Sequence, residues 1–168
     1  MKYLIIDRLI LGSLATNCYI LTINNDCIVI DPADDYDKIK KKICGKNILG
    51  TIVTHHHFDH VGALNYFDKV YDINNLKEGI NTLGTFNFEV IYTPGHTNDS
   101  ICIYFKKEKI MFVGDFLFKD GIGRVDLGGN ILDMKNSLVK INKYDKDITI
   151  YPGHGDKSKL GCEVNKYL

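Results

Sequence analysis

Short apolar runs separated by polar turns recur along the chain and predict a protein built mainly from strands. Residues 3–11, 18–23 and 27–30 are expected to form three strands, and Asn24-Asn25-Asp26 has the composition of a hairpin turn between the last two. Later apolar runs predict strands at 51–53, 70–73, 86–92, 100–105, 109–113 and 148–151.

Helical spacing of apolar residues is found at three places. Asp31 and Pro32 are expected to open the first helix as its cap and first residue. A short second helix, with its leucine and phenylalanine buried, is predicted over 61–68, and Asn130 is expected to cap a third over 131–141. Strands and helices thus alternate in two similar halves, which favours two sheets packed face to face with helices outside.

The composition fits one compact domain. With 168 residues and 45% hydrophobic content, the chain is long enough for one sizeable core, so residues 1–168 are expected to form a single domain. Lys plus Arg equals Asp plus Glu at 21 each, which disfavours binding to nucleic acid or to an anionic membrane. Asp7 and Arg8 interrupt the apolar N-terminal run, so neither a targeting segment nor a membrane span is expected.

The cysteines indicate a reducing compartment. They are odd in number, scattered, and never spaced as Cys-x-x-Cys, so we expect small buried hydrophobic residues rather than disulfides or ligands. This predicts a cytoplasmic protein. The five residues are Cys18, Cys27, Cys44, Cys102 and Cys162.

The chemistry concentrates in residues 54–60, which read Thr-His-His-His-Phe-Asp-His. Four imidazoles and a carboxylate in seven residues all need polar partners, and a metal ion satisfies them together. The preceding run is short and β-branched, so these side chains would emerge at the carboxyl end of a buried strand. Three other predicted strands are followed closely by His96, Asp115 and His154.

Six candidate ligands and one further aspartate exceed what one tetrahedral ion uses, which implies two ions. The six candidates are His55, His57, Asp59, His60, His96 and His154. Asp115 is then the natural bridge between the ions. His56 should point away from them, because its neighbours on both sides point inward.

The pattern His55-x-His57-x-Asp59-His60, followed by Pro-Gly-His, Gly-Asp and a final Gly-His, resembles the metallo-β-lactamase superfamily. The resemblance implies an α+β fold, an αββα sandwich of two mixed β-sheets. It implies two divalent ions, zinc in the first place, with iron or manganese as alternatives. One ion would be held by His55, His57 and His96, the other by Asp59, His60 and His154, with Asp115 shared.

Residues 12–19 and the Gly-Arg-x-Asp element at 123–126 are similar to glyoxalase II and its short, hydroxyacylglutathione hydrolase-like relatives. This implies a thioester or similar small acyl substrate, attacked by a hydroxide between the ions, with Asp59 and Asp115 as catalytic residues. The C-terminal helical region that holds glutathione in glyoxalase II is not expected here. The sequence also departs from the family pattern, with Asp99 and Ala33 where glycine is usual.

Several assignments stay open at this stage. A mononuclear iron persulfide dioxygenase-like oxidoreductase is the alternative function, using His55, His57, His96 and Asp115. Asp31 and Thr54 either fix imidazole tautomers or form a helix cap and strand-end hydrogen bonds. Arg124 either pairs with Asp126 or meets an acidic substrate. The aromatics Tyr19, Phe116 and Phe118 line a pocket or fill the core.

Overall fold

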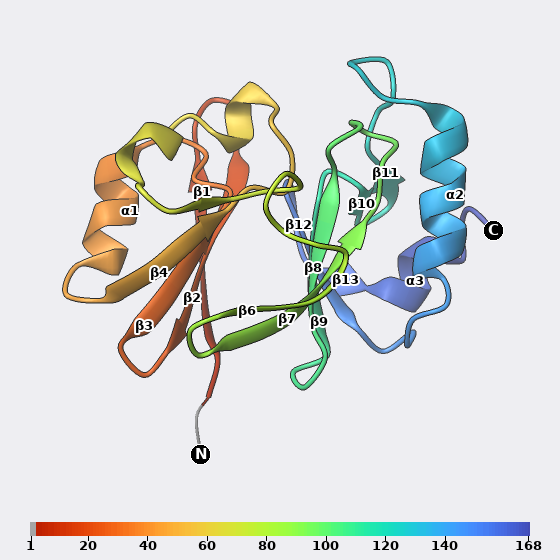
Figure 1. Cartoon of the computed structure of the whole chain (residues 1–168). Coiled ribbons are helices and arrows are strands. Elements are labelled where there is room, and N and C mark those ends of the chain that lie inside the picture. Colours follow the sequence, from red (N-terminus) through yellow and green to blue (C-terminus); the bar gives the residue numbers. More distant parts are fainter. Residues whose placement is uncertain (1–2) are drawn as a thin grey trace.

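The computed structural model describes residues 3–168 and contains two β-sheets that lie face to face (Figure 1). Neighbouring strands of the first sheet are antiparallel from β1 to β3 and parallel from β3 to β5, so this sheet is mixed. Its strands, in order, are β1 (Ile5–Leu11), β2 (Thr16–Ile23), β3 (Asp26–Ile30), β4 (Asn47–Ile52) and β5 (Val70–Tyr71).

The second sheet is also mixed, because β9 and β12 run parallel while the other neighbours are antiparallel. Its strands, in order, are β13 (Ser158–Lys159), β12 (Thr149–Pro152), β9 (Ile110–Gly114), β8 (Ile101–Phe105), β7 (Phe86–Tyr92) and β6 (Gly79–Leu83). A separate two-stranded ribbon is formed by β10 (Leu117–Phe118) and β11 (Gly121–Ile122).

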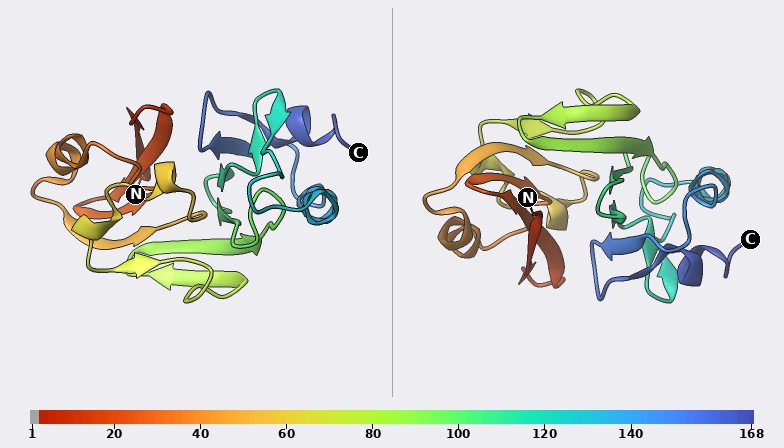
Figure 2. Two further views of the ribbon diagram at one scale, coloured as in Figure 1. Left: turned by 90° about the horizontal axis from the view of Figure 1, so that it is seen from above. Right: turned by 90° about the horizontal axis from the view of Figure 1, so that it is seen from below.

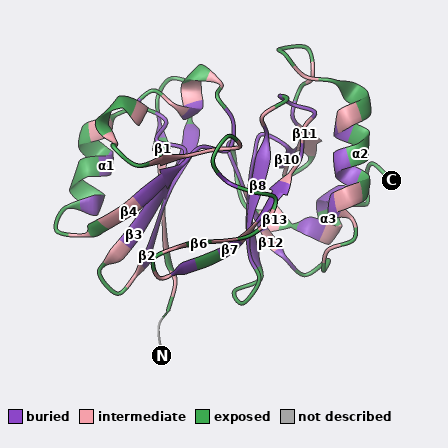
Figure 3. Cartoon of the chain, viewed as in Figure 1, coloured by how far each residue is buried: buried purple, intermediate pink, exposed green. Residues whose placement is uncertain are grey.

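Helices cover the outer faces of both sheets (Figure 2). Helix α1 (Tyr36–Ile43) packs on the first sheet, and α2 (Ile131–Ile141) and α3 (Leu160–Val164) pack on the second. The buried side chains accordingly form three layers, one between the sheets and one under each helical layer (Figure 3). The expected αββα sandwich of two mixed sheets is therefore confirmed.

The two-residue period of the strands explains how one sheet serves two apolar layers. In β2, Tyr19 and Leu21 belong to the core between the sheets, whereas Cys18 and Ile20 pack in the layer under α1. Successive side chains of a strand point to opposite faces, so a strand buried on both sides reads as an unbroken apolar run. All but the last residue of β2 are buried.

Two predicted elements differ in the structure, and five elements were not predicted. The first helix begins at Tyr36 rather than at Asp31-Pro32, and Asp35 before it has a left-handed backbone (φ 47°). Residues 61–68 do not form a helix but contain one 3-10 turn, Leu64–Tyr66. The elements β6, β10, β11, β13 and α3 were not predicted, because short segments carry too little periodicity. Asn130 does cap α2, accepting from the backbone N–H groups of residues 132 and 133.

The cysteine prediction holds for three of the five residues. Cys18, Cys27 and Cys102 are buried, whereas Cys44 and Cys162 are exposed, so these two are not core residues. Within residues 3–168, no helix is long and apolar enough to cross a membrane.

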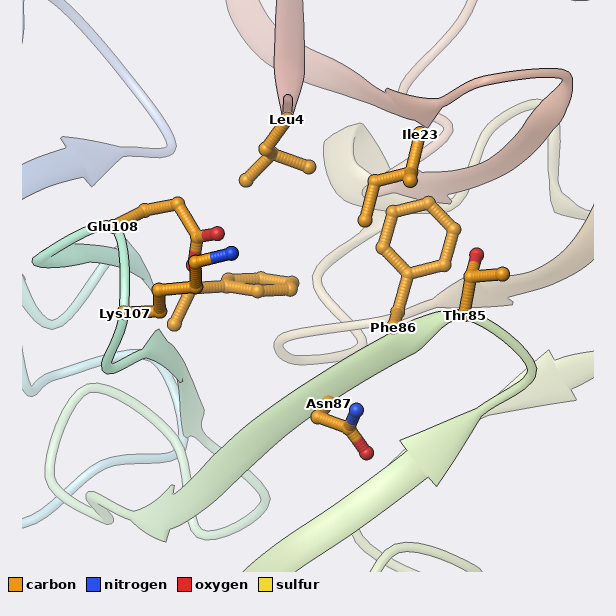
Figure 4. A pocket seen from close by; sticks show the side chains of 8 residues that line it. Leu4, Ile23, Thr85, Phe86, Asn87, Lys107 and Glu108 are labelled. Carbon is orange, nitrogen blue, oxygen red and sulfur yellow. The ribbon is translucent and has the colours of Figure 1, made fainter. Parts of the chain in front are cut away.

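The directions of the strands place the candidate ligands that follow them at one edge of the sandwich. Strands β7 and β9 are both antiparallel to β8, and β12 is parallel to β9, so all three end at the same edge. The opposite edge contains a cavity of about 200 Å³ lined by Leu4, Ile23, Phe86, Lys107 and Glu108 among others (Figure 4). That cavity has no histidine and lies far from the candidate ligands in the fold.

Candidate metal centre

All seven predicted ligands come together at the edge where the strands end. His55 and His57 follow β4, Asp59 and His60 belong to the 3-10 turn η1 (Phe58–His60), and the other three follow β7, β9 and β12. Six of them form two triads, and the ligand atoms of each triad lie within 4.8 Å of one another. The first triad is His55, His57 and His96, and the second is Asp59, His60 and His154.

Asp115 lies between the two triads. Its Oδ2 atom is 3.6 Å from His96 Nε2 and 3.3 Å from His154 Nε2. Its Oδ1 atom is 3.2 Å from His60 Nε2. One carboxylate therefore contacts side chains of both triads, as the bridging position requires.

In four of the five candidate imidazoles, Nδ1 contacts an oxygen atom outside the centre and Nε2 faces inward. Nδ1 of His96 donates to the Arg124 carbonyl (2.7 Å), and Nδ1 of His154 donates to the Leu14 carbonyl (3.1 Å). His57 is reversed, since its Nε2 donates to the Leu127 carbonyl at 3.2 Å and its Nδ1 lies 2.9 Å from His96 Nε2. A carbonyl can only accept, so the outer nitrogen carries the proton and the inner nitrogen has a free lone pair.

The other two imidazoles are oriented through Asp31. This buried carboxylate accepts from the Thr54 backbone N–H (2.7 Å), the Thr54 hydroxyl (2.6 Å) and His60 Nδ1 (2.8 Å). Because the Thr54 hydroxyl donates to Asp31, its oxygen accepts from His55 Nδ1 at 3.1 Å. Asp31 and Thr54 thus fix the two tautomers, and Asp31 is not the cap of α1.

Three buried polar atoms at the centre have no hydrogen-bond partner in the described chain: His55 Nε2, His60 Nε2 and Asp115 Oδ1. Buried polar atoms without partners are rare and destabilising. Imidazole nitrogens and carboxylate oxygens that converge on one point are the donor set of zinc and related divalent ions. The residues present therefore fit a pair of metal ions.

Two of the three most perturbed groups at the centre, His55 and Asp115, have the protonation state that a cation needs, and the third, His60, does not. Burial lowers the pKa of His55 to about 2, so this imidazole is neutral at pH 7. Burial raises the pKa of Asp115, but the adjacent imidazoles of His154 and His60 outweigh burial and hold it below its usual range. Burial lowers the pKa of His60, but Asp31 and Asp115 outweigh that effect and raise it to about 10. A cation bound at His60 Nε2 would displace this proton.

Glycine is required where the backbone approaches the ligands. A Cβ atom at Gly153 would lie 2.2 Å from Asp115 Oδ1 and 2.5 Å from His60 Cε1. Gly114 has a left-handed backbone (φ 52°), and a Cβ atom there would lie 2.5 Å from the Thr54 hydroxyl oxygen. The Gly-Asp and Gly-His motifs therefore contribute backbone space as well as ligands.

Comparison with known proteins identifies the family. The model of the metallo-beta-lactamase superfamily matches residues 11–81 and 76–154. The chain belongs to this superfamily. It is 30% identical to the probable metallo-hydrolase YqgX of Bacillus subtilis (strain 168), over 95% of this chain and 94% of that protein. It is 34% identical to the hydroxyacylglutathione hydrolase of Francisella tularensis subsp. novicida (strain U112), over 85% of this chain and 64% of that protein.

Solved structures of the metallo-beta-lactamase fold superpose closely. The BLEG-1 B3 metallo-beta-lactamase has a TM-score of 0.88 at 28% identity, with 94% of this chain and 95% of that chain covered. A di-iron-bound form of TTHA1623 has a TM-score of 0.82 at 27% identity, with 93% and 96% covered. ETHE1 from Myxococcus xanthus has a TM-score of 0.83 at 25% identity, with 94% and 80% covered.

In this member of the metallo-beta-lactamase superfamily, His56 is held away from the triads. Its backbone N–H and its Nδ1 atom contact Asp99 Oδ2 at 3.0 and 2.7 Å, and its Nε2 lies 3.2 Å from Asp72 Oδ2. Asp99, which stands where glycine is usual, therefore anchors the loop that carries His55 and His57. The sequence did not predict this role.

Four other contacts at the centre were not predicted. The Thr16 hydroxyl donates to Asp59 Oδ2 at 2.8 Å and orients that carboxylate. The carbonyls of Leu14, Arg124 and Leu127 orient three imidazoles. A backbone carbonyl is present whatever the side chain is, so these three positions leave no signal in the residue pattern.

The structure also places Arg124 and the three aromatic residues whose roles the sequence left undecided. Arg124 Nε donates to Asp126 Oδ1 at 2.7 Å, and both side chains are exposed, so the pair forms. Tyr19 and Phe116 are core residues. Phe118 is half-buried, and its ring centroid lies 6.2 Å from that of His154, which places it beside the second triad.

Proposed function

We propose that the protein is a hydrolase that uses two divalent metal ions to cleave a thioester or a similar small acyl compound. The observation that carries the proposal is the complete pair of triads joined by Asp115. The named hydroxyacylglutathione hydrolase and probable metallo-hydrolase relatives support it. Because the chain spans only 64% of the hydroxyacylglutathione hydrolase, the thiol part of the substrate is left to experiment.

His55, His57 and His96 would hold one ion, and Asp59, His60 and His154 the other, with Asp115 shared. Ions bound there would lower the pKa of water toward neutrality and polarise the acyl carbonyl. Asp59 Oδ2 accepts a hydrogen bond from the Thr16 hydroxyl. This bond fixes the orientation of the Asp59 carboxylate, and therefore the position of its other oxygen, Oδ1. That oxygen would accept a hydrogen bond from the attacking water and orient it.

The leaving group sets a further requirement. A thiol has a pKa of only about 8.5, so a thioester can release its thiolate with little proton donation from the protein. The described residues around the triads include no lysine or tyrosine hydroxyl bonded to a ligand, which suits a substrate of this kind. We infer zinc as the first candidate metal, with iron and manganese as alternatives, from the donor set of five imidazoles and two carboxylates.

The test combines metal analysis with turnover. Protein loaded with zinc, iron or manganese should contain two ions per chain and hydrolyse members of a panel of acyl thioesters. His57→Ala should abolish hydrolysis, while Lys107→Gln, at the opposite edge of the sandwich, should retain it. Full hydrolysis by His57→Ala would refute the proposal.

A mononuclear iron oxygenase acting on persulfides is the second candidate. It is favoured by the similarity to ETHE1 from Myxococcus xanthus and by the Gly-Arg-x-Asp element, whose arginine and aspartate are paired. The complete second triad favours the hydrolase instead. One iron per chain together with oxygen consumption on a persulfide would establish the oxygenase, whereas two ions and no oxygen consumption would exclude it.

A further inference from the structure

A groove is lined by residues of β1, β2 and β12 and by the segments that carry Lys119 and residues 156–157. In Figure 2, the N-terminal strands and the C-terminal segments that contribute these residues lie side by side. The groove has a volume of about 520 Å³, and its floor includes Tyr19 and Tyr151. The Tyr19 hydroxyl donates to the Pro152 carbonyl at 2.6 Å, and the two tyrosine rings pack edge to face. Tyr19 belongs to the core between the sheets and half-buried Tyr151 packs against it, so the floor of the groove is part of the packed interior.

Cationic side chains line this groove. The lining includes three cationic side chains, Arg8, Lys119 and Lys157, and one carboxylate, that of Asp156. Arg8 Nη1 lies 3.2 Å from Asp156 Oδ1 and donates to the Gly155 carbonyl at 3.0 Å, so this charge pair is internally compensated. Arg8 still has its Nε and Nη2 donors free of protein contacts within residues 3–168.

The two lysines remain uncompensated. Among the described residues, neither ammonium group has an acidic partner, and that of Lys157 lies 5.9 Å from the Tyr151 ring centroid. Asp120, next to Lys119 in the chain, is paired with Lys166 at 2.6 Å. The groove thus has a net positive charge in a protein whose overall charge is zero.

The groove is linked to the second triad through the backbone, because Arg8, which lines it, donates to the carbonyl of Gly155, the residue after His154. Lys119 directly follows Phe118, whose ring lies beside that of His154. Asp156 and Lys157 follow His154 within three residues. A substrate with its acyl carbonyl at the metal centre could therefore extend its thiol part past Phe118 into the groove.

We propose that this basic groove (Arg8, Lys119 and Lys157) binds an anionic group, a carboxylate or a phosphate, at the far end of the thiol part of the substrate. The inference rests on the proposed thioester hydrolysis, because the groove would hold the thiol part of that substrate while its acyl carbonyl is at the metal centre. Ammonium and guanidinium donors recognise both anions by charge-assisted hydrogen bonds. The groove would select anionic thiols over neutral ones.

Matched substrates test the proposal and separate the two anions. S-acetyl-4′-phosphopantetheine is compared with S-acetylpantetheine, and S-acetylglutathione with its diethyl ester, all on metal-loaded protein. At least one anionic substrate should have a KM about tenfold below that of its neutral partner, with similar kcat. The pair that shows the difference identifies phosphate or carboxylate, and the difference should shrink at high salt.

The double variant Lys119→Gln/Lys157→Gln should reduce the tenfold difference to less than about twofold, without changing kcat on the neutral substrate. Lys119→Arg/Lys157→Arg should retain the difference, and so should Lys107→Gln, whose lysine lines the cavity at the opposite edge (Figure 4). Equal KM values within both substrate pairs, or an unchanged difference in the glutamine variant, would overturn the proposal.

A binding measurement separates the proposal about the groove from the proposal about thioester hydrolysis. S-methylglutathione and S-methyl-4′-phosphopantetheine are thioethers, so their binding by calorimetry requires no turnover. If no thioester is hydrolysed but one thioether binds about tenfold more weakly to the glutamine variant, the groove stands and thioester hydrolysis is wrong. Binding of neither thioether, or equal binding to both proteins, rejects the groove.

Discussion

Asp31→Asn is the sharpest test of how the metal centre is organised. The substitution keeps the shape of the side chain but leaves one oxygen where there were two. The amide oxygen can still accept from the Thr54 backbone N–H. The amide nitrogen then faces two donors, the Thr54 hydroxyl and His60 Nδ1, which both donate to Oδ2 in the native protein.

The magnitude follows from those two contacts. Each buried donor left without an acceptor costs about 1–3 kcal/mol, so the free energy of unfolding should fall by about 2–6 kcal/mol if neither group rearranges. His60 can avoid its share by moving its proton to Nε2, but that nitrogen then loses the lone pair that faces Asp115. Affinity for the ion of the second triad should therefore fall about 10–100-fold.

Competition with a chromophoric chelator measures the two metal affinities, and thermal unfolding of the metal-free protein measures stability. We expect the weaker-binding ion to be lost first and the melting temperature to fall by about 2–4 °C per kcal/mol. Asp37→Asn, on the exposed face of α1, is the control. If Asp31→Asn binds two ions with native affinity, Asp31 does not set the tautomer of His60.

Three further predictions concern single side chains. Gly153→Ala should lose the second ion by metal analysis while remaining folded by circular dichroism, because its Cβ would meet Asp115 and His60 at 2.2 and 2.5 Å; native metal content would contradict this. Asp99→Ala should release metal faster to a chelator, since it frees the His56 N–H in the ligand loop; an unchanged rate would show that the loop needs no anchor. Burial raises the pKa of Glu163, but hydrogen bonds from Lys166, Ser158 and the Asp120 N–H outweigh it and leave that pKa lowered. Its stabilisation is therefore present above about pH 4.3 and lost as the pH falls, so the native protein's advantage over Glu163→Gln in chemical unfolding should vanish in acid.

The sandwich and the position of its chemistry could be predicted because both follow from periodic or residue-specific patterns. Buried strands such as β2 and β8 read as unbroken apolar runs, and α2 has a recognisable cap at Asn130. The seven candidate ligands were found because only a few residue types bind metals. The structure brings all seven together.

Other elements gave no such signal. The strand β13 has two residues and α3 has five, which is too short for any period to emerge. Residues 61–68 have the spacing of a short helix, but Gly62 lies against the Ala33 carbonyl, where a Cβ atom would approach to 2.2 Å. Because this segment packs closely against the 31–34 loop, it forms only a 3-10 turn.

The ligands of the centre can be recognised in the sequence, but the groups that orient them cannot. An imidazole that binds a metal must be histidine, so its position is visible in the sequence. The acceptor that fixes its tautomer can be any backbone carbonyl, and at Leu14, Arg124 and Leu127 it is one. These three carbonyls belong to the loops that flank the centre, 11–16 and 123–129. A change of loop conformation would therefore alter the tautomers and the metal affinity of this centre without replacing a single ligand.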